Sequence, residues 1–213
     1  MTSEKMTVHK ALAELKLLDD RISKAIDENT YCLAKKHSSE KINGISLAEF
    51  EKQMQGGYDK AVALIERRKA IKKAVVLSNA ITKVTVAGTE YTVAEAIEMK
   101  NHGINFEEML MVTMANQHKK AVSVINLENG KDLETRADQY VTAIYGQKEG
   151  KTNTADIDKV KADFLKSNQY ELVNPLDITG KINELEDRIN LFMAEVDSAL
   201  SVSNALTEIE VNY

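Results

Sequence analysis

Residues 77–86 of this chain read LSNAITKVTV, and residues 202–211 repeat the stretch as VSNALTEIEV. Five of the ten positions are identical, and three more are aliphatic in both copies. Each copy follows a long helical pattern and leads into alternating apolar and polar residues, which are typical of a β-strand. The repeat therefore predicts two helix-to-strand junctions built alike, whose strands meet in one small sheet.

The residues around the first copy predict a β-hairpin over about 83–93, with a turn at Ala87–Thr89. A two-stranded hairpin alone is marginal in water, so we expect a C-terminal strand over about 206–212 to join it as a third strand. Thr92 and Glu95 have the spacing of a capping box, which predicts a helix directly after the hairpin.

Long helices dominate the rest of the chain. Apolar residues recur at steps of three and four over 8–25, 54–75 and 182–199. These seams predict a mainly α fold, an antiparallel long-helix bundle with a small antiparallel β-sheet. We expect one elongated helical domain over 1–213, with an inserted helical region at about 101–175. Long coiled-coil-like seams seldom bury themselves within one small chain, so the sequence favours a homo-oligomer.

Composition excludes several function classes. The formal net charge of −5 argues against general nucleic-acid binding, which needs a basic surface. Cys32 is the single cysteine, which leaves no disulfide and no cysteine cluster for zinc. The start of the chain lacks a signal-peptide pattern, and no run of 18 apolar residues occurs. We expect a protein without membrane contact, in the cytoplasm of a bacterial or phage-infected cell.

A basic run over 67–73 is the sharpest candidate site in this acidic chain. It includes Arg67, Arg68 and Lys72, and Arg68 interrupts an otherwise apolar seam. A solvated helix face that complements the helix dipole is one interpretation. The other is an anion-binding site, because a partly buried guanidinium needs a carboxylate, a phosphate or several carbonyl groups.

Four further residues extend the candidate ligand-binding set. Asn79 and Thr82 follow the basic run, and Thr92 would lie nearby if the hairpin folds back. Their simplest role is to cap helices and turn the chain. His118 lies on an apolar helix face, where a histidine is usually a packed core residue and less often a ligand or proton carrier. We found no metal-binding, phosphate-loop or nucleophile motif, so we expect no metal, no cofactor and no enzymatic activity.

Several stretches together resemble a known family. They are ALAELKLLDDRI at 11–22, LIERRKAI at 64–71, TVAEAI at 92–97 and the last helix with its short threonine-containing tail. In this order they look like a family of small uncharacterised bacterial proteins often labelled septicolysin, which has relatives in phages. The resemblance covers about 6–32, 60–100 and 178–212. It implies a mainly helical, oligomeric, cytoplasmic protein and carries over no functional residues.

Two function hypotheses follow from the sequence. The first is a homo-oligomer that binds a small anionic, nucleotide-like ligand between subunits, such as a phage protein that sequesters a host immune signal. The second is a structural or assembly protein, such as a scaffold or virion component, without a small-molecule ligand. The basic run and Arg68 favour the first hypothesis, and the long seams without any catalytic motif favour the second.

Overall fold

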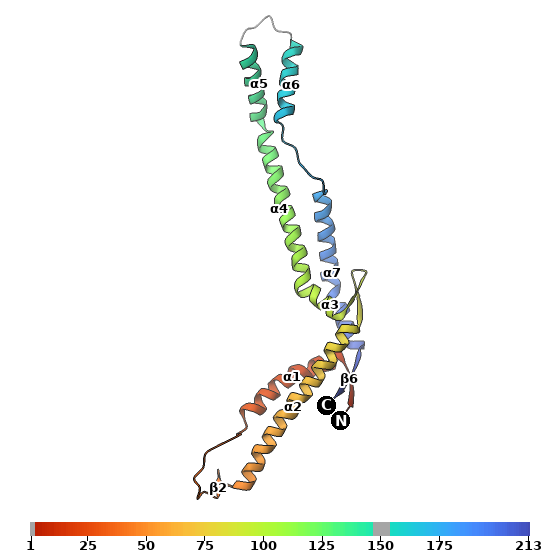
Figure 1. The fold of residues 1–213 in the computed structure, drawn as a ribbon. Coiled ribbons are helices and arrows are strands. Elements are labelled where there is room, and N and C mark those ends of the chain that lie inside the picture. The colour runs from red at the N-terminus through yellow and green to blue at the C-terminus, as the bar shows by residue number, and fades with distance from the viewer. Residues whose placement is uncertain (1–2, 147–153) are drawn as a thin grey trace. The chain divides into compact units, whose positions relative to one another are not determined.

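The computed structural model describes residues 3–146 and 154–213 (Figure 1). Its helices are α1 (Val8–Asp27), α2 (Leu47–Ile81), α3 (Val93–Glu98), the π-helical turn η1 (Met99–Gly103), α4 (Ile104–Glu128), α5 (Lys131–Tyr145), α6 (Thr154–Asn168) and α7 (Ile178–Leu206). Its strands are β1 (Ser3–Thr7), β2 (Lys41–Ile42), β3 (Ile45–Ser46), β4 (Lys83–Val86), β5 (Thr89–Thr92) and β6 (Glu208–Asn212). The predicted mainly α fold with small antiparallel sheets is confirmed.

The chain forms two compact units. Unit 1 comprises the residues up to Gly103 and those from Leu191 onward, and unit 2 comprises Ile104–Asn190. The helical region that the sequence predicts as an insertion, about 101–175, thus falls almost wholly in unit 2, together with the first part of α7.

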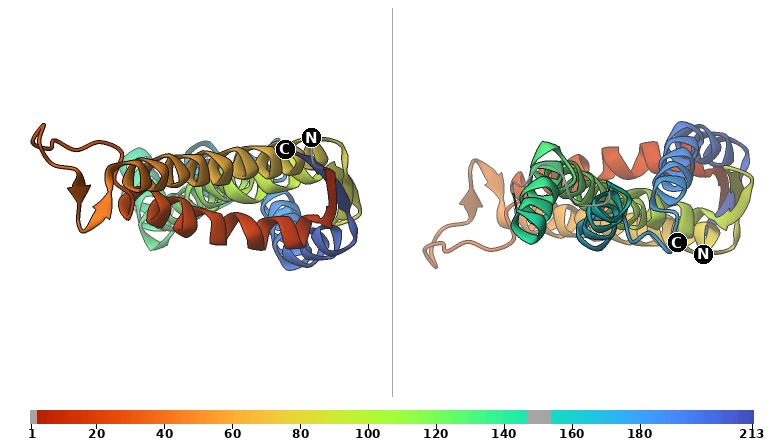
Figure 2. Two further views of the ribbon diagram at one scale, coloured as in Figure 1. Left: turned by 90° about the horizontal axis from the view of Figure 1, so that it is seen from below. Right: turned by 90° about the horizontal axis from the view of Figure 1, so that it is seen from above.

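The core of unit 1 lies between α1, α2 and the paired strands β1 and β6. Helices α1 and α2 run side by side (Figure 2). Their facing apolar side chains pack with those of the two strands. The buried members of this core are Met6, Val8, Ala11, Leu15, Leu18, Ile71, Val75, Ile209 and Val211.

The predicted three-stranded sheet is wrong. Strand β6 pairs with β1, with Thr7 opposite Glu208 and Ser3 opposite Asn212, and β4 pairs only with β5 among the described residues. The residues SEKMT at 3–7 contain a single large apolar residue, Met6, so their sequence does not predict a strand. In the structure Met6 is buried and this segment is the partner of β6. The hairpin does not need a third strand, because Tyr91 packs edge-on against Phe192 of α7, with ring centroids 5.9 Å apart.

A second repetition accompanies the first. The residues Met6-Thr7-Val8 with Ala11 correspond to Tyr91-Thr92-Val93 with Ala96, so β1 and α1 repeat β5 and α3. The strand registers match as well: Thr7 lies opposite Glu208 as Thr92 lies opposite Lys83. Unit 1 therefore contains two copies of one strand–helix module.

Local hydrogen bonds are the same in both copies. The threonine hydroxyls of Thr7 and Thr92 each accept the amide N–H three residues later, at 3.2 Å. The N–H of Val8 donates to the Thr207 carbonyl at 2.9 Å, and the N–H of Val93 donates to the Thr82 carbonyl at 2.8 Å. These bonds fix each strand against the helix end from which the partner strand departs.

We call the copy formed by β1, α1, β6 and α2 the open module, and the copy formed by β5, α3, β4 and residues 191–206 of α7 the closed module. Each module is completed by a strand that continues the long helix of the other: β6 follows α7, and β4 follows α2. A turn at Ala87 and Gly88, with φ of 52° and 73°, joins the strands of the closed module. The chain ends lie at the corresponding place in the open module (Figure 1).

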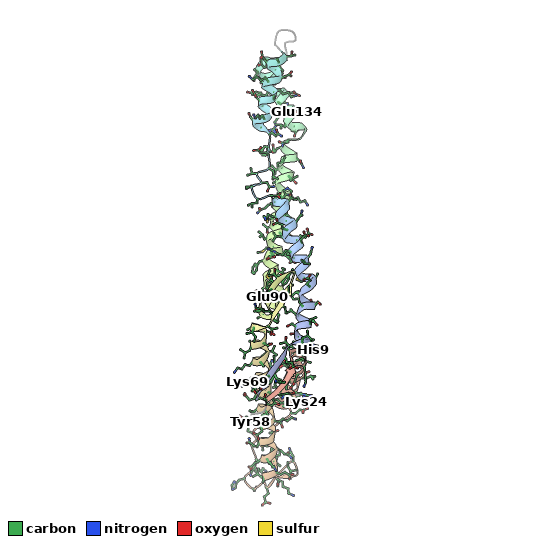
Figure 3. All side chains as sticks on the ribbon, turned by 90° about the vertical axis from the view of Figure 1, so that its right-hand side faces the viewer. His9, Lys24, Tyr58, Lys69, Glu90 and Glu134 are labelled. Atoms are coloured by element: carbon green, nitrogen blue, oxygen red, sulfur yellow. The ribbon has the colours of Figure 1, made fainter. Side chains whose placement is uncertain are left out.

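Unit 2 has a much smaller core. Helices α5 and α6 pack together through Leu133 and Ala137 of α5 and through the ring pair Tyr140–Phe164, 4.8 Å between centroids. Lys161 bridges Glu134 and Asp138 of α5, at 3.0 and 2.6 Å (Glu134 is labelled in Figure 3). Of the described residues of α4, Ile104 alone is buried.

Candidate functional site

The basic run lies on α2 where this helix packs against α1. Arg67 points into this contact, and its side chain is 21% exposed. Its guanidinium donates hydrogen bonds to Glu14 and, at 3.0 Å, to Glu4, and it lies 4.6 Å from the ring centroid of Tyr213. The hydrogen bond to Glu14, more than any other interaction, raises the pKa of Arg67 above its ordinary value.

Glu4, one of the two carboxylates beside Arg67, is held in its charged form. Hydrogen bonds from Arg67 and then Lys10 lower the pKa of Glu4 below its ordinary value of 4.5. An incoming anion would have to displace Glu4 or Glu14 from a partly buried, hydrogen-bonded cluster. The cluster therefore accounts for Arg67 without a ligand.

The module repeat assigns Arg67 a packing position. Arg67 and Phe192 each lie eleven residues before the serine of the repeated stretch, Ser78 and Ser203. Phe192 is buried at 2% exposure and packs on Tyr91 in the closed module. Arg67 holds the same place in the open module, and it fills that place with an ion-pair cluster and the Tyr213 ring.

Arg68 and Lys72 lie on a different face, in a shallow groove between α1 and α2. The groove has a volume of about 590 Å³ and is lined by His9, Leu12, Ala13, Leu15, Lys16, Asp19, Arg68 and Lys72. His9 lies in the first turn of α1, next to the paired strands of the open module (Figure 3). Arg68 donates to Asp19 at 2.5 Å, and its side chain is 42% exposed. Three cations with one carboxylate give the groove a positive balance.

The predicted ligand-binding residues at the junction of α2 with the hairpin, Thr82 and Thr92, make local hydrogen bonds that cap helices. The Thr82 hydroxyl lies 3.3 Å from the Ser78 hydroxyl, and Thr92 caps α3. The carboxylate of Glu95 accepts the Thr92 backbone N–H at 2.7 Å and its hydroxyl at 2.9 Å. These two bonds, the backbone one first, lower the pKa of Glu95. Asn79 is half-buried in the last turns of α2.

The seven predicted ligand-binding residues fall in separate places. Arg67, Arg68 and Lys72 lie on two faces of the α1–α2 pair, and Asn79, Thr82 and Thr92 lie at the junction. His118 is half-buried on α4 in unit 2. Unit 1 thus groups only Arg68 and Lys72 of this set in one groove.

Sequence reasoning missed the partners that this region uses. Glu4 and Glu14 bind Arg67, and His9 and Lys16 line the groove with Arg68. A signal was present, because Glu14 and Asp19 lie off the apolar seam of 8–25, where they can face the basic run of a neighbouring helix. Local periodicity does not predict that α1 packs against α2, which is what brings these carboxylates to the basic run.

Within residues 3–146 and 154–213, no three His, Cys, Asp or Glu side chains gather closely enough to hold a metal ion. In the same residues, no helix combines the length and the apolar composition needed to cross a membrane.

Comparison with known proteins adds no relative. No family model, curated protein or solved structure matches this chain. The fold and the candidate groove thus rest on the chain's own residues and contacts.

Proposed function

We propose that this protein is a non-enzymatic structural or assembly protein that associates with copies of itself, in the cytoplasm of a bacterial or phage-infected cell. The observation that carries the proposal is the exposed surface. The chain exposes 15313 Å². Two compact bodies that divide its mass as units 1 and 2 do would expose about 12,000 Å² together.

The difference is about 3,000 Å² per chain, or about 6,000 Å² for two chains, which is enough to supply the total of about 2,000–5,000 Å² that obligate homodimers bury. Helix α4 carries several large apolar side chains on this exposed surface. Phe106, Met109 and Leu127 are 67%, 61% and 72% exposed, and they lie on the side of α4 away from its half-buried face. Long helices in water derive most of their stability from packing an apolar face, which supports a second copy as the occupant of this face.

Light scattering coupled to gel filtration tests the proposal. We expect a mass well above the 23.7 kDa of one chain. The double variant Met109→Asp/Leu127→Asp should shift the protein toward the single-chain mass. Asn183→Asp, an exposed polar position on α7 and outside the apolar face of α4, is the control and should not change the mass. A wild-type protein that stays a single chain at all concentrations would overturn the proposal.

A second candidate function is the binding of a small anionic, nucleotide-like ligand by the oligomer. The positive balance of the α1–α2 groove favours it, with Lys16, Arg68 and Lys72 around the apolar side chains Leu12 and Leu15. Such a protein, if it comes from a phage, could sequester a nucleotide-derived immune signal of its host. The septicolysin resemblance remains a prediction alongside this candidate.

A thermal-shift screen with nucleotides, cyclic nucleotides and ADP-ribose derivatives tests the groove. A ligand that binds the folded state raises the melting temperature as its concentration exceeds Kd. The double variant Lys16→Gln/Lys72→Gln should lose this response. Lys73→Gln lies on the same helix but outside the groove and should keep it. If none of these compounds raises the melting temperature of an intact oligomer, they are excluded as ligands and the assembly function is favoured.

A further inference from the structure

The two modules of unit 1 differ in how their strands are joined. In the closed module, Ala87 and Gly88 connect β4 to β5 covalently. In the open module, the same pairing is made by the two ends of the chain, β1 and β6. Strand β6 is therefore attached to its module by contacts alone, and its covalent attachment is to α7 through Thr207.

The seat of β6 is a well-formed site for an extended segment. Ile209 and Val211 are 7% and 0% exposed and belong to the same core as Ile71 and Val75 of α2. Backbone pairing with β1 sets the register, with Met6 opposite Ile209. The Ser3 hydroxyl also donates to the Glu210 carboxylate at 2.6 Å. The site selects an antiparallel strand with apolar side chains at alternate positions.

We propose that β6 of one copy completes the open module of a second copy, so that strand exchange links the chains of the assembly. The proposal rests on the self-association proposed above. An exchanged β6 makes the same contacts between chains as within one chain, so exchange needs only a different path at Thr207. The proposed occupant is β6 of a second copy, because the structure shows that this strand fits the site in pairing and in packing.

The internal architecture already uses this device. Strand β4 leaves α2 and pairs with β5, whose Tyr91 packs on Phe192 of α7, whereas β6 leaves α7 and packs against α2. The exchange of strands between helix pairs is thus built into unit 1. The turn at Ala87–Gly88 joins β4 to β5 directly, whereas β1 and β6 are joined only through the rest of the chain between them.

Cysteine pairs can report the exchange, with the closed module as a matched control. Lys5 lies opposite Glu210, and Thr85 lies opposite Glu90. In an antiparallel ladder, hydrogen-bonded and non-hydrogen-bonded residue pairs alternate. Val8–Thr207 and Val93–Thr82 are hydrogen-bonded pairs. Lys5–Glu210 and Thr85–Glu90 each lie three pairs further along their ladder, so both are non-hydrogen-bonded pairs. Such pairs have Cα atoms about 4.5 Å apart, within the range that a disulfide can bridge. All four side chains are exposed, so each substitution should be tolerated.

The experiment mixes two single-cysteine proteins in a Cys32→Ser background, since Cys32 is exposed. Lys5→Cys protein is unfolded and refolded together with Glu210→Cys protein and then oxidised. A disulfide between them can form in register only if β6 has passed from one chain to the other. Thr85→Cys with Glu90→Cys, treated identically, reports the background of chance cross-links.

We expect a band at twice the single-chain mass on a non-reducing gel for the first mixture, and a clearly weaker one for the hairpin mixture. Equal bands in both mixtures, or no band in either, would overturn strand exchange. Light scattering on the same samples separates the two proposals. An oligomer that lacks the specific cross-link would refute strand exchange but support self-association. Single chains without cross-links would refute both proposals.

Discussion

The open and closed modules share strand register and helix caps, but they fill one core position differently. The closed module uses Phe192, which packs on the ring of Tyr91. The open module uses Arg67, which is held by Glu4, Glu14 and the ring of Tyr213. A conspicuous basic residue can thus be part of the packing between two helices. The comparison separates Arg67, which has this role, from Arg68, which faces the groove.

The largest expected effect comes from the apolar member of the comparison. Phe192→Ala removes a ring that is 2% exposed, and a buried Phe→Ala change costs about 3–5 kcal/mol. Chemical denaturation followed by circular dichroism should show this loss in the unfolding of unit 1. A loss smaller than that of Arg67→Ala would refute the assignment of Phe192 as the stronger core residue.

Arg67→Ala should have the next largest effect. It leaves Glu4 and Glu14 without their shared donor, and hydrogen bonds to charged groups contribute about 1.5–3 kcal/mol. We expect a loss at the lower end of that range, because the cluster is partly exposed. Denaturant titration measures it. Arg67→Phe, which copies the closed module, tests the packing role and should regain less than half of the loss, because Glu14 still lacks its donor and Glu4 keeps only Lys10.

The caps of the two modules should behave alike. Thr7→Ala and Thr92→Ala each remove a hydroxyl that accepts an amide N–H at 3.2 Å, which costs about 1 kcal/mol. Thr92→Ala should be the more costly by a few tenths of that amount, since it also releases the Glu95 carboxylate. The same denaturation assay distinguishes them, and a clearly larger loss for Thr7→Ala would contradict the equivalence of the modules.

Arg68→Ala should have the smallest effect on stability. Its ion pair with Asp19 is exposed on both sides, at 42% and 58%, and such pairs contribute about 0–1 kcal/mol. A melting temperature close to that of the wild type is expected. A loss as large as that of Arg67→Ala would show that Arg68 is also part of the packing.

Acid should weaken the open module through Glu4. The pKa of Glu4 in the folded protein is below its ordinary value of 4.5, so its stabilising contribution is complete above that value. The contribution is lost as the pH falls through the lowered pKa. Glu4→Gln should therefore reduce the acid sensitivity of unfolding, measured as the denaturation midpoint at a series of pH values. Identical acid profiles for Glu4→Gln and the wild type would contradict this role.

Local features of the fold were predictable from the sequence, and non-local ones were not. The hairpin at 83–92 and the Thr92–Glu95 capping box follow from residues within a few positions of one another. The pairing of β1 with β6 joins opposite ends of the chain and depends on which helices cover Ile209 and Val211. The periodicity of apolar residues along the sequence does not predict which strand pairs with β6 or which helices cover it.

The candidate site was predictable in the same limited sense. The positive charge of 67–73 was evident, and Arg68 and Lys72 do line a groove. The sequence did not reveal that Arg67 already has two carboxylate partners, because Glu4 and Glu14 reach it from another strand and helix. Alignment of the two copies at Ser78 and Ser203 places Phe192 at the position of Arg67, so this correspondence is present in the sequence alone.

The neighbouring chain ends have a consequence for the order of the sequence itself. Since Glu4 lies opposite Val211 just as Thr89 lies opposite Val86, unit 1 resembles a ring that could be opened at either of two comparable points. A chain that begins at Gly88 and ends at Ala87 could be made by joining Asn212 to Ser3 through a short glycine bridge. Every pairing described above would survive in that circular permutant, and the roles of the two modules as open and closed would be reversed.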